Sequence, residues 1–509
     1  MPLILLINPK FRKDLQPCPQ NIAAREPLSI LALGSYIKKI DLEVKLIDVV
    51  LYKEEHISGL ISNIITNEPK PILIGFSVMT AQVSHALHLS DLVRSIDKSI
   101  PIVWGGVHPT LFPKETSLDG SVDIVVHGRG EAPLFTICEQ LMTKGRIAGD
   151  IPGTCVKGKF NAPEKNIEMI DYPYLDYELL DLKRYLGPFP HFLSDKPNRA
   201  LNIISARGCP WRCAFCINKA TDNQWTPLGH ERYLDELSIN IKRYNLDAYR
   251  VIDEDFFFSK GRASEIITGL KKREITKEWG TNIKASYFRD DYISLDFAKN
   301  LKSTGCKFFN IGAESGNQRI LDLITKDITV EQIIHSAEVC SQADIIPIYS
   351  WMIGIPTQSK KEIFDTIEIM IQISRICPPA IHYSFSIFRP YPGSGLYDLC
   401  IKNGLRVPRA LRDWAGMITD ENIEHGNVHT GYYKIENLPW IKEEKFIEFL
   451  AKYAHIIPGI LSKSIKVKIK ASLVYIVVTK WDALLAKIIV ILIELRAQVI
   501  KIIRRPFSI

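Results

Sequence analysis

Three cysteines lie close together near the middle of the chain, in the stretch Arg207-Gly208-Cys209-Pro210-Trp211-Arg212-Cys213-Ala214-Phe215-Cys216. Their spacing is C-x-x-x-C-x-x-C, whereas the other cysteines are isolated from one another along the sequence. Thiolates gathered in one short loop are typical metal ligands, so Cys209, Cys213 and Cys216 predict a metal site. Isolated cysteines more often behave as small buried hydrophobes.

The number of these cysteines narrows the choice of metal. A structural zinc site needs four protein ligands, and no fourth cysteine or nearby histidine follows, since the next cysteine is Cys306. Iron–sulfur clusters also take thiolate ligands, usually four. Three cysteines would leave one iron open to an external ligand. A zinc knuckle or a buried cysteine cluster without metal is the alternative.

The elements that must position this loop form an α/β region that begins at Arg199. Apolar β-branched runs predict strands at 201–205, 248–252, 282–286, 307–311, 347–353 and 382–387, with helical patterns near 232–244, 260–271, 294–303, 329–342 and 360–374. Six strand–helix units predict a partial (β/α)6 barrel, whose active site lies at the carboxyl ends of its strands. The cysteine loop follows the first of these strands.

A loop with an open iron at the start of a partial barrel resembles the radical S-adenosylmethionine (SAM) enzymes. The resemblance implies that Cys209, Cys213 and Cys216 hold a 4Fe-4S cluster. Its fourth iron would bind the amino and carboxylate groups of SAM. One electron from a flavodoxin or ferredoxin type of donor would then cleave SAM to a 5′-deoxyadenosyl radical.

Further SAM contacts follow from the same resemblance. Phe215 matches the aromatic position near the adenine, and Gly354 follows strand five near the adenine. Asp253 and Asp255 end strand two, where alternation sends both to one face, toward the ammonium group of SAM. They stand in place of the family's Gly-Gly-Glu. Glu314 ends strand four and would accept hydrogen bonds from the ribose or another polar part of SAM, the alternative being a helix cap.

The first 150 residues predict a doubly wound, Rossmann-like parallel sheet. Its strands are expected at 3–7, 44–49, 72–77, 102–104 and 123–126. Ligands bind at the carboxyl ends of such strands. The small or polar residues expected there are Ser77, Gly105, Gly106, His108 and Gly128. Glycines let a bulky ligand approach the backbone, although they could also serve only as turns.

This region resembles the cobalamin-binding domain of one branch of radical SAM enzymes. The resemblance rests on Pro27-Leu28-Ser29, on the stretch from Trp104 to Thr110 and on the stretch from His127 to Glu131. No D-x-H-x-x-G motif is present, so no histidine is expected as lower cobalt ligand. Cobalamin would be bound without a protein histidine, or the domain binds nothing. The small residues at the strand ends favour binding.

The resemblance implies radical chemistry on an unactivated carbon of a small-molecule substrate under anaerobic conditions. The expected outcome is C-methylation, with methylcobalamin giving a methyl group to the substrate radical, which makes the protein a cobalamin-dependent methyltransferase. Relatives with this architecture also include an anaerobic tetrapyrrole cyclase, so a cyclase or another carbon-skeleton enzyme is the alternative. A non-catalytic cobalamin or iron–sulfur sensor is the alternative from a different class of protein.

The predicted organisation has five parts: a cobalamin-binding-like domain at 1–150, a proline-containing linker at 151–198, the barrel at 199–395, a C-terminal region at 396–470 and a basic amphipathic tail at 471–509. Ten cysteines in 509 residues favour a reducing compartment. No signal peptide and no spanning helix are expected. The expected location is therefore the cytoplasm, with a peripheral position at the inner face of the membrane as the further option.

The C-terminal tail carries most of the basic character. Residues 461–509 hold ten Lys and Arg against Asp482 and Glu494, a local charge of +8 in a chain whose total is +7. The body is thus nearly neutral, which argues against a nucleic-acid partner. The tail is expected to lie on an anionic membrane as an in-plane helix, or else to dock on the barrel as an ordinary terminal helix. Membrane contact would suit a lipid, isoprenoid or tetrapyrrole substrate.

Overall fold

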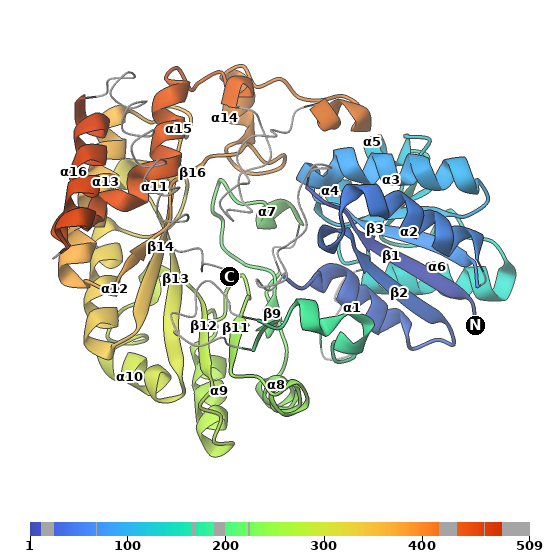
Figure 1. Cartoon of the computed structure of the whole chain (residues 1–509), viewed down its shortest axis with the longest axis horizontal. Coiled ribbons are helices and arrows are strands. Elements are labelled where there is room, and N and C mark those ends of the chain that lie inside the picture. Colours follow the sequence, from blue (N-terminus) through green and yellow to red (C-terminus); the bar gives the residue numbers. More distant parts are fainter. Residues whose placement is uncertain are drawn as a thin grey trace, which may run out of the picture.

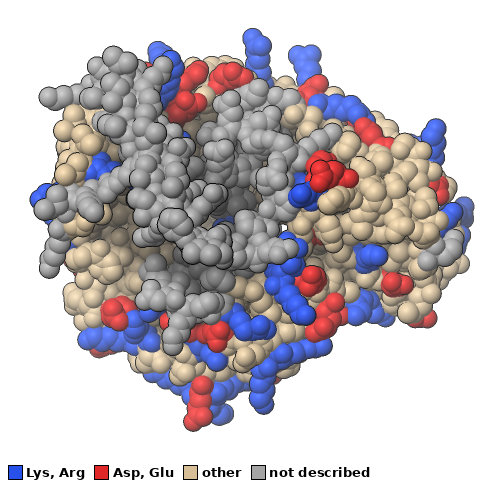
Figure 2. Space-filling model, in the orientation of Figure 1, with Lys and Arg blue, Asp and Glu red and all other residues tan. Residues whose placement is uncertain are grey.

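Two parallel sheets with their covering helices make up the protein. The computed structural model describes residues 1–11, 25–67, 69–164, 169, 172–187, 199–221, 224–416, 435–462 and 464–480. In Figure 1 the blue N-terminal domain lies beside the green and yellow barrel, and the orange and red C-terminal helices lie mainly against the barrel. Acidic and basic side chains are interspersed over the described part of the face seen in Figure 2.

The N-terminal sheet has the strand order β2-β1-β3-β4-β5-β6-β7. Its strands are β1 (Leu3–Asn8), β2 (Glu43–Asp48), β3 (Pro71–Ser77), β4 (Ile102–Gly105), β5 (Ile124–Val126), β6 (Thr154–Val156) and β7 (Lys159–Phe160), and its helices are α1 (Leu28–Ile37), α2 (Glu54–Thr66), α3 (Val83–Ile96), α4 (Val107–Leu111), α5 (Pro113–Ser117) and α6 (Glu131–Lys144). The five predicted strands are present and parallel, which confirms the doubly wound fold. β6 and β7 add an antiparallel hairpin from the segment expected to be a linker.

Both faces of this sheet are buried, as the alternation along β1 shows. Leu3, Leu5 and Ile7 pack into the core on one face. Ile4 and Leu6 pack into the core on the other face. Because successive side chains of a strand point to opposite faces, a strand that is apolar throughout needs helices on both sides. The carboxyl-end edge of the sheet is then the place left for a ligand.

The second sheet has the order β15-β14-β13-β12-β11-β8, with β16 also beside β14, and all its pairs are parallel. Its strands are β8 (Ala200–Ile203), β11 (Ala248–Val251), β12 (Glu278–Ile283), β13 (Cys306–Glu314), β14 (Ile346–Ile353), β15 (Ile381–His382) and β16 (Ser386–Ile387), and its helices are α8 (His230–Tyr244), α9 (Lys260–Lys272), α10 (Leu295–Ser303), α11 (Gln318–Leu323), α12 (Val330–Ala343) and α13 (Lys360–Ile376). The order does not close on itself, which confirms a partial barrel.

The third barrel strand begins four residues earlier than the sequence pattern predicted. The expected strand was 282–286, whereas β12 spans Glu278–Ile283. Trp279 is buried there, and its indole N–H donates to the carbonyl and the hydroxyl oxygens of Thr304, both at 3.2 Å. The start of β12 has no β-branched apolar run, so its pattern was missed. As a result, Lys284 directly follows the carboxyl end of the strand.

A small apolar cluster fills the barrel interior near the amino-terminal ends of the strands. It contains Ala200, Ala248, Phe308 and Ile348, which come from four different strands. The Phe308 ring lies over Gly280 of β12, where an added Cβ would come within 2.4 Å of a ring atom. This close approach is why β12 carries a glycine at its centre.

The C-terminal region runs back across both domains. Its helices are α14 (Tyr397–Lys402), η7 (Leu411–Gly416), η8 (Ile435–Asn437), α15 (Glu444–Tyr453), η9 (Ala454–Leu461) and α16 (Ile465–Lys480). Arg412 of η7 pairs with Asp91 and Asp119 of the N-terminal domain at 3.1 and 2.9 Å. The Trp414 ring packs on Phe112, with centroids 4.7 Å apart. This segment therefore ties the C-terminal region to the N-terminal domain.

Replacing Gly280 tests the packing of the barrel interior. Gly280→Ala should destabilise the protein by about 1–3 kcal/mol, because the new methyl group would press on the Phe308 ring. Gly261→Ala in α9 is the matched control, since a Cβ there would meet nothing within 4 Å. Denaturant unfolding measures both changes. Equal stability of the two variants would contradict the described packing.

Candidate active site at the junction of the two domains

The cysteine loop joins β9 (Ala206–Arg207) to α7 (Asn218–Thr221) and is held from two sides. The backbone N–H of Ala214 donates to the carbonyl oxygen of Ile324 at 2.7 Å. The carbonyl oxygen of Ala214 accepts from the N–H of Leu396 at 2.9 Å. Because these partners follow α11 and the sixth strand, the centre of the loop is fixed by the barrel itself.

The three thiols are partly buried and form no disulfide. Burial raises the pKa of Cys209 to about 12 and also raises the pKa of Cys216. Both thiols therefore stay protonated until a metal cation displaces the proton. Among the described residues, no group of three ligands converges closely enough to hold a single metal ion. A 4Fe-4S cluster needs no such convergence, because each thiolate binds a different iron, and the three cysteines fit such a cluster.

The two aspartates after β11 have different surroundings. Asp253 is buried and accepts hydrogen bonds from the N–H and the hydroxyl of Ser205 at 2.7 and 2.5 Å, and burial raises its pKa to about 6. Asp255 accepts from the indole N–H of Trp211 at 2.6 Å and from the hydroxyl of Tyr287 at 2.7 Å. Its other oxygen, Oδ1, is buried with no hydrogen-bond partner in the described part of the chain. Asp255 is thus the aspartate that contacts the cysteine loop.

Lys284 also belongs to this site, although no sequence pattern predicted it. Its ammonium lies 3.4 Å from the centre of the ring of Trp211, a residue of the cysteine loop. This ammonium is buried, and none of the described residues accepts a hydrogen bond from it. Burial lowers the pKa of Lys284, and the thiol of Cys213 opposes that change. The aromatic face stabilises the cation, but three N–H donors still lack an acceptor.

Glu314 ends β13 and forms an ion pair with Lys326 at 3.1 Å. The pair lies over Gly312, where a Cβ would come within 2.6 Å of the Glu314 Oε1 atom. Burial alone would lower the pKa of Lys326, but the charges of Glu314 and Cys213 raise it above its usual value. The Lys326 ammonium lies 5.4 Å from the centre of the Phe215 ring. Two cations, Lys326 and Lys284, therefore lie against aromatic rings of the cysteine loop.

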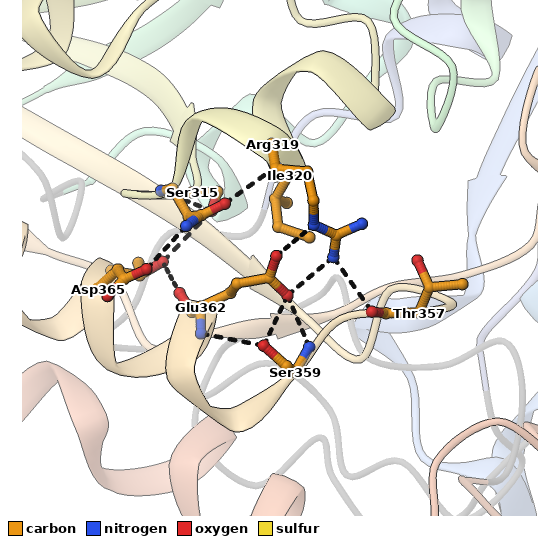
Figure 3. A network of polar contacts seen from close by, with 9 residues as sticks. Ser315, Arg319, Ile320, Thr357, Ser359, Glu362 and Asp365 are labelled. Carbon is orange, nitrogen blue, oxygen red and sulfur yellow. Dashed lines mark hydrogen bonds and ion pairs between the residues drawn. The ribbon is translucent and has the colours of Figure 1, made fainter.

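The turn after β13 is fixed by polar contacts between α11 and α13 (Figure 3). Arg319 forms two hydrogen bonds to the Glu362 carboxylate, one of them at 2.8 Å. These bonds lower the pKa of Glu362 to about 2. Glu362 also accepts from the N–H and hydroxyl of Ser359 at 2.7 and 2.9 Å, which caps α13. The N–H of Gly316 donates to Thr366 of the same helix at 2.9 Å, so the turn is anchored to α13.

Gly354 directly follows β14 and has φ of 75°. Its N–H donates to the Gln358 side chain at 2.9 Å, and its carbonyl oxygen accepts from the indole N–H of Trp440 at 2.8 Å. A Cβ at this position would come within 3.0 Å of Ile441. The positive φ and the close neighbour both require glycine.

A cavity of about 320 Å³ lies where the N-terminal sheet meets the barrel. Four of the predicted cobalamin contacts line it: Ser77, Gly105, Gly106 and Gly128. The barrel contributes Ile204, Ala206, Arg207, Ile252 and Glu254. A Cβ on Gly128 would meet nothing within 4 Å, so this position faces open space. Walls of this kind, mainly apolar with a few polar groups, fit a large cofactor such as cobalamin.

The structure places His108 away from the lining of this cavity. Its side chain is buried, 5.1 Å from the Phe112 ring and 5.5 Å from the Trp414 ring between centroids. Burial lowers the pKa of His108 to about 3, so the imidazole is neutral. Its Nδ1 atom lies 3.3 Å from the Thr80 hydroxyl. His108 therefore belongs to the contact with the C-terminal segment.

Polar side chains cross the junction beside the cavity. Arg207, two residues before Cys209, forms an ion pair with the buried Glu131 at the start of α6. Arg129 donates to the hydroxyl of Thr226 at 2.7 Å, on the strand that pairs with β9. The cysteine loop and the cavity are therefore held together by direct contacts between the two domains.

Two family models match the chain at these two places. Residues 203–370 match the radical SAM superfamily, and residues 26–137 match the B12 binding domain. The chain is a radical SAM enzyme with a B12-binding domain. Its cofactors are accordingly a 4Fe-4S cluster, SAM and cobalamin, and its reaction needs a reductant and a small-molecule substrate.

Several proteins are similar to most of this chain. It is 27% identical to an uncharacterized methyltransferase of Pyrococcus horikoshii, over 78% of this chain and 83% of that protein. It is 23% identical to the anaerobic magnesium-protoporphyrin IX monomethyl ester cyclase of Rubrivivax gelatinosus, over 65% of this chain and 58% of the cyclase. The fold is also that of the radical SAM methyltransferase TsrM of Kitasatospora setae, with a TM-score of 0.63, 17% identity and coverage of 86% and 87%.

Substituting single cysteines tests the cluster site. Cys209→Ala, Cys213→Ala and Cys216→Ala should each lose the cluster after anaerobic reconstitution, because a 4Fe-4S cluster with two protein thiolates is weakly held. Cys306→Ala, in the buried part of β13, should keep the iron and sulfide content of the wild-type protein. Iron and sulfide analysis measures both. Zinc without iron in the reconstituted wild-type protein would contradict the assignment.

Proposed function

We propose that this enzyme transfers a methyl group to an unactivated carbon of its substrate by cobalamin-dependent radical chemistry. The contact between the two domains supports this proposal. The cysteine loop at the carboxyl end of β8 and the glycine-lined cavity of the N-terminal sheet lie on either side of the Arg207–Glu131 ion pair. A substrate between them would be close to both cofactors at once.

The cofactors supply the reactive groups, a radical initiator from SAM at the cluster and a methyl group from cobalamin. The chain's own residues would bind and orient them. We propose that SAM lies over the carboxyl ends of β11 to β14, near Asp253, Asp255, Glu314, Gly354 and Phe215. Among these, Asp255 has a buried, unpartnered carboxylate oxygen suited to an ammonium group.

Lys284 extends this SAM site. Its position between Asp255, which follows the neighbouring strand β11, and Glu314, which ends the other neighbouring strand β13, favours a role at the centre of the bound molecule. A buried ammonium without acceptors is costly unless a ligand provides them. The carboxylate of SAM is an anion that the cluster's open iron would hold at this end of the barrel. We therefore propose that Lys284 binds the SAM carboxylate.

Ring formation is the alternative outcome of the radical chemistry. The similarity to an anaerobic magnesium-protoporphyrin IX monomethyl ester cyclase favours ring formation as the alternative to methyl transfer. Both outcomes begin with the same cleavage of SAM. A non-catalytic sensor, in contrast, would not cleave it.

Product analysis separates these functions. Reduced, reconstituted enzyme given SAM should form 5′-deoxyadenosine, and the Cys213→Ala variant should form none above background. Cobalt(II) in the bound cobalamin should show no coupling to a histidine nitrogen in electron paramagnetic resonance, because no described histidine lines the cavity. Absence of 5′-deoxyadenosine in the cluster-loaded enzyme would contradict the enzymatic function. Coupling to a histidine nitrogen would contradict the cobalamin site.

Lys284→Met tests the proposed carboxylate contact. The dissociation constant for SAM should rise at least tenfold, which corresponds to about 1.4 kcal/mol, while the iron content stays unchanged. Lys299→Met, an exposed lysine of α10, is the matched control and should bind SAM like the wild-type enzyme. Titration of SAM against the cluster-loaded protein measures the affinity. Wild-type affinity in Lys284→Met would overturn this assignment.

The substrate class and the membrane contact stay predictions of the sequence. The basic residues from Lys487 onward lie outside the described residues, as does Trp481. In the described part of the tail, α16 packs against η9 with Ala471, Val474 and Val477 buried. No helix in the described ranges is long and apolar enough to cross a membrane. We propose that residues 481–509 contact an anionic surface and that the substrate is a lipid, isoprenoid or tetrapyrrole.

A further inference from the structure

Arg250 points into the barrel interior. It lies on β11 two residues after Ala248, so both side chains share one face of the strand. Ala248 packs with Phe308 and Ile348 in the small cluster inside the barrel. Its neighbours on β11, Tyr249 and Val251, instead join the core between the sheet and the helices.

No described acidic side chain neutralises Arg250. Its Nε atom is buried without a hydrogen-bond partner among the described residues. The residue beside it on β8, Asn202, is directed to Glu26 instead. Arg250 as a whole is half-buried. A guanidinium partly withdrawn from water without an acidic partner destabilises a folded protein, which favours a role for Arg250 beyond packing.

A second cation approaches from the N-terminal domain. Glu26 accepts hydrogen bonds from the side chain and the backbone N–H of Asn202 at 2.5 and 3.1 Å. This contact places the backbone of the adjacent Arg25, an exposed residue, beside β8, one of the two edge strands of the partial barrel. Burial lowers the pKa of Arg250, and the positive charge of Arg25 lowers it further. Burial raises the pKa of Tyr383, which follows β15 at the other edge, and the positive charges of both arginines oppose this change.

Glu26 balances these two charges only in part, although the charge of Arg25 does lower its pKa. Its carboxyl group is occupied by Asn202, and burial raises its pKa to about 7, so it is only partly ionised at neutral pH. Two guanidinium groups from different domains thus lie within electrostatic range of each other at the open side of the barrel. Two like charges that one partly ionised acid does not fully offset favour an anion between them.

We propose that Arg250 and Arg25 bind the anionic head group of the substrate, a carboxylate or a phosphate, at the open side of the barrel. The inference rests on the proposed function, in which the substrate lies between the domains, and it adds the substrate's charge. Guanidinium groups bind either anion through paired N–H donors. The apolar interior formed by Phe308 and Ile348 would face the rest of the molecule.

Three probes with the same apolar chain test this site: octanoate, octyl phosphate and 1-octanol. Calorimetry with the cluster-loaded enzyme should show that one anionic probe binds at least tenfold more tightly than 1-octanol. The tighter of the two anions identifies the head group as carboxylate or phosphate. Arg250→Met should remove this preference, and Arg25→Met should weaken it.

Arg375→Met, an exposed arginine of α13, is the matched control and should keep the preference. The thermal midpoint of Arg250→Met should equal or exceed that of the wild-type protein, since the variant loses a half-buried charge that has no described acidic partner. Equal binding of 1-octanol and both anions, an unchanged preference in Arg250→Met, or a marked fall in its thermal midpoint would each overturn the inference. Formation of 5′-deoxyadenosine without substrate, measured in parallel, reports on the proposed function separately.

Discussion

The structure depends on holding the carboxyl-end edges of two parallel sheets against each other. Parallel sheets bind ligands at those edges, because helices cover their faces. Here the contacts that cross between the edges are made by ionised and amide groups, above all Arg207 with Glu131 and Glu26 with Asn202. Arg207 and Glu131 also line the cavity. The same side chains therefore set the distance between the domains and shape the site between them.

The site also contains cationic side chains whose buried nitrogens have no described hydrogen-bond acceptor. Lys284 and Arg250 are partly or fully shielded from water, and each has a buried nitrogen without a described acceptor. In contrast, Lys326 and Glu314 satisfy each other. Proteins retain uncompensated charge mainly where a ligand completes it, and this cost in stability is typical of functional sites. In our proposals these two cations bind two different anions, Lys284 the carboxylate of SAM and Arg250 the head group of the substrate.

Much of this architecture was predictable from sequence, because strong local patterns produced it. The spacing of Cys209, Cys213 and Cys216 predicts the metal loop, and ten of eleven expected strands lie close to their predicted positions. The exception, β12, begins with Glu278 and Trp279, where tertiary packing of one indole replaces an apolar run. Contacts between distant residues were not predictable. No local pattern tells that Asn202 binds Glu26, that Trp414 covers His108, or that 154–160 extend the first sheet.

In the proposed enzyme, one junction holds both cofactors close together. The most direct measurement is the electron-spin relaxation of cobalt(II) in enzyme that carries both cobalamin and the cluster. If the cluster lies at the cysteine loop and cobalamin in the adjacent cavity, reducing the cluster to its paramagnetic form should speed the relaxation of the cobalt spin. Identical relaxation with the cluster oxidised and reduced, in protein shown to contain both, would contradict the account.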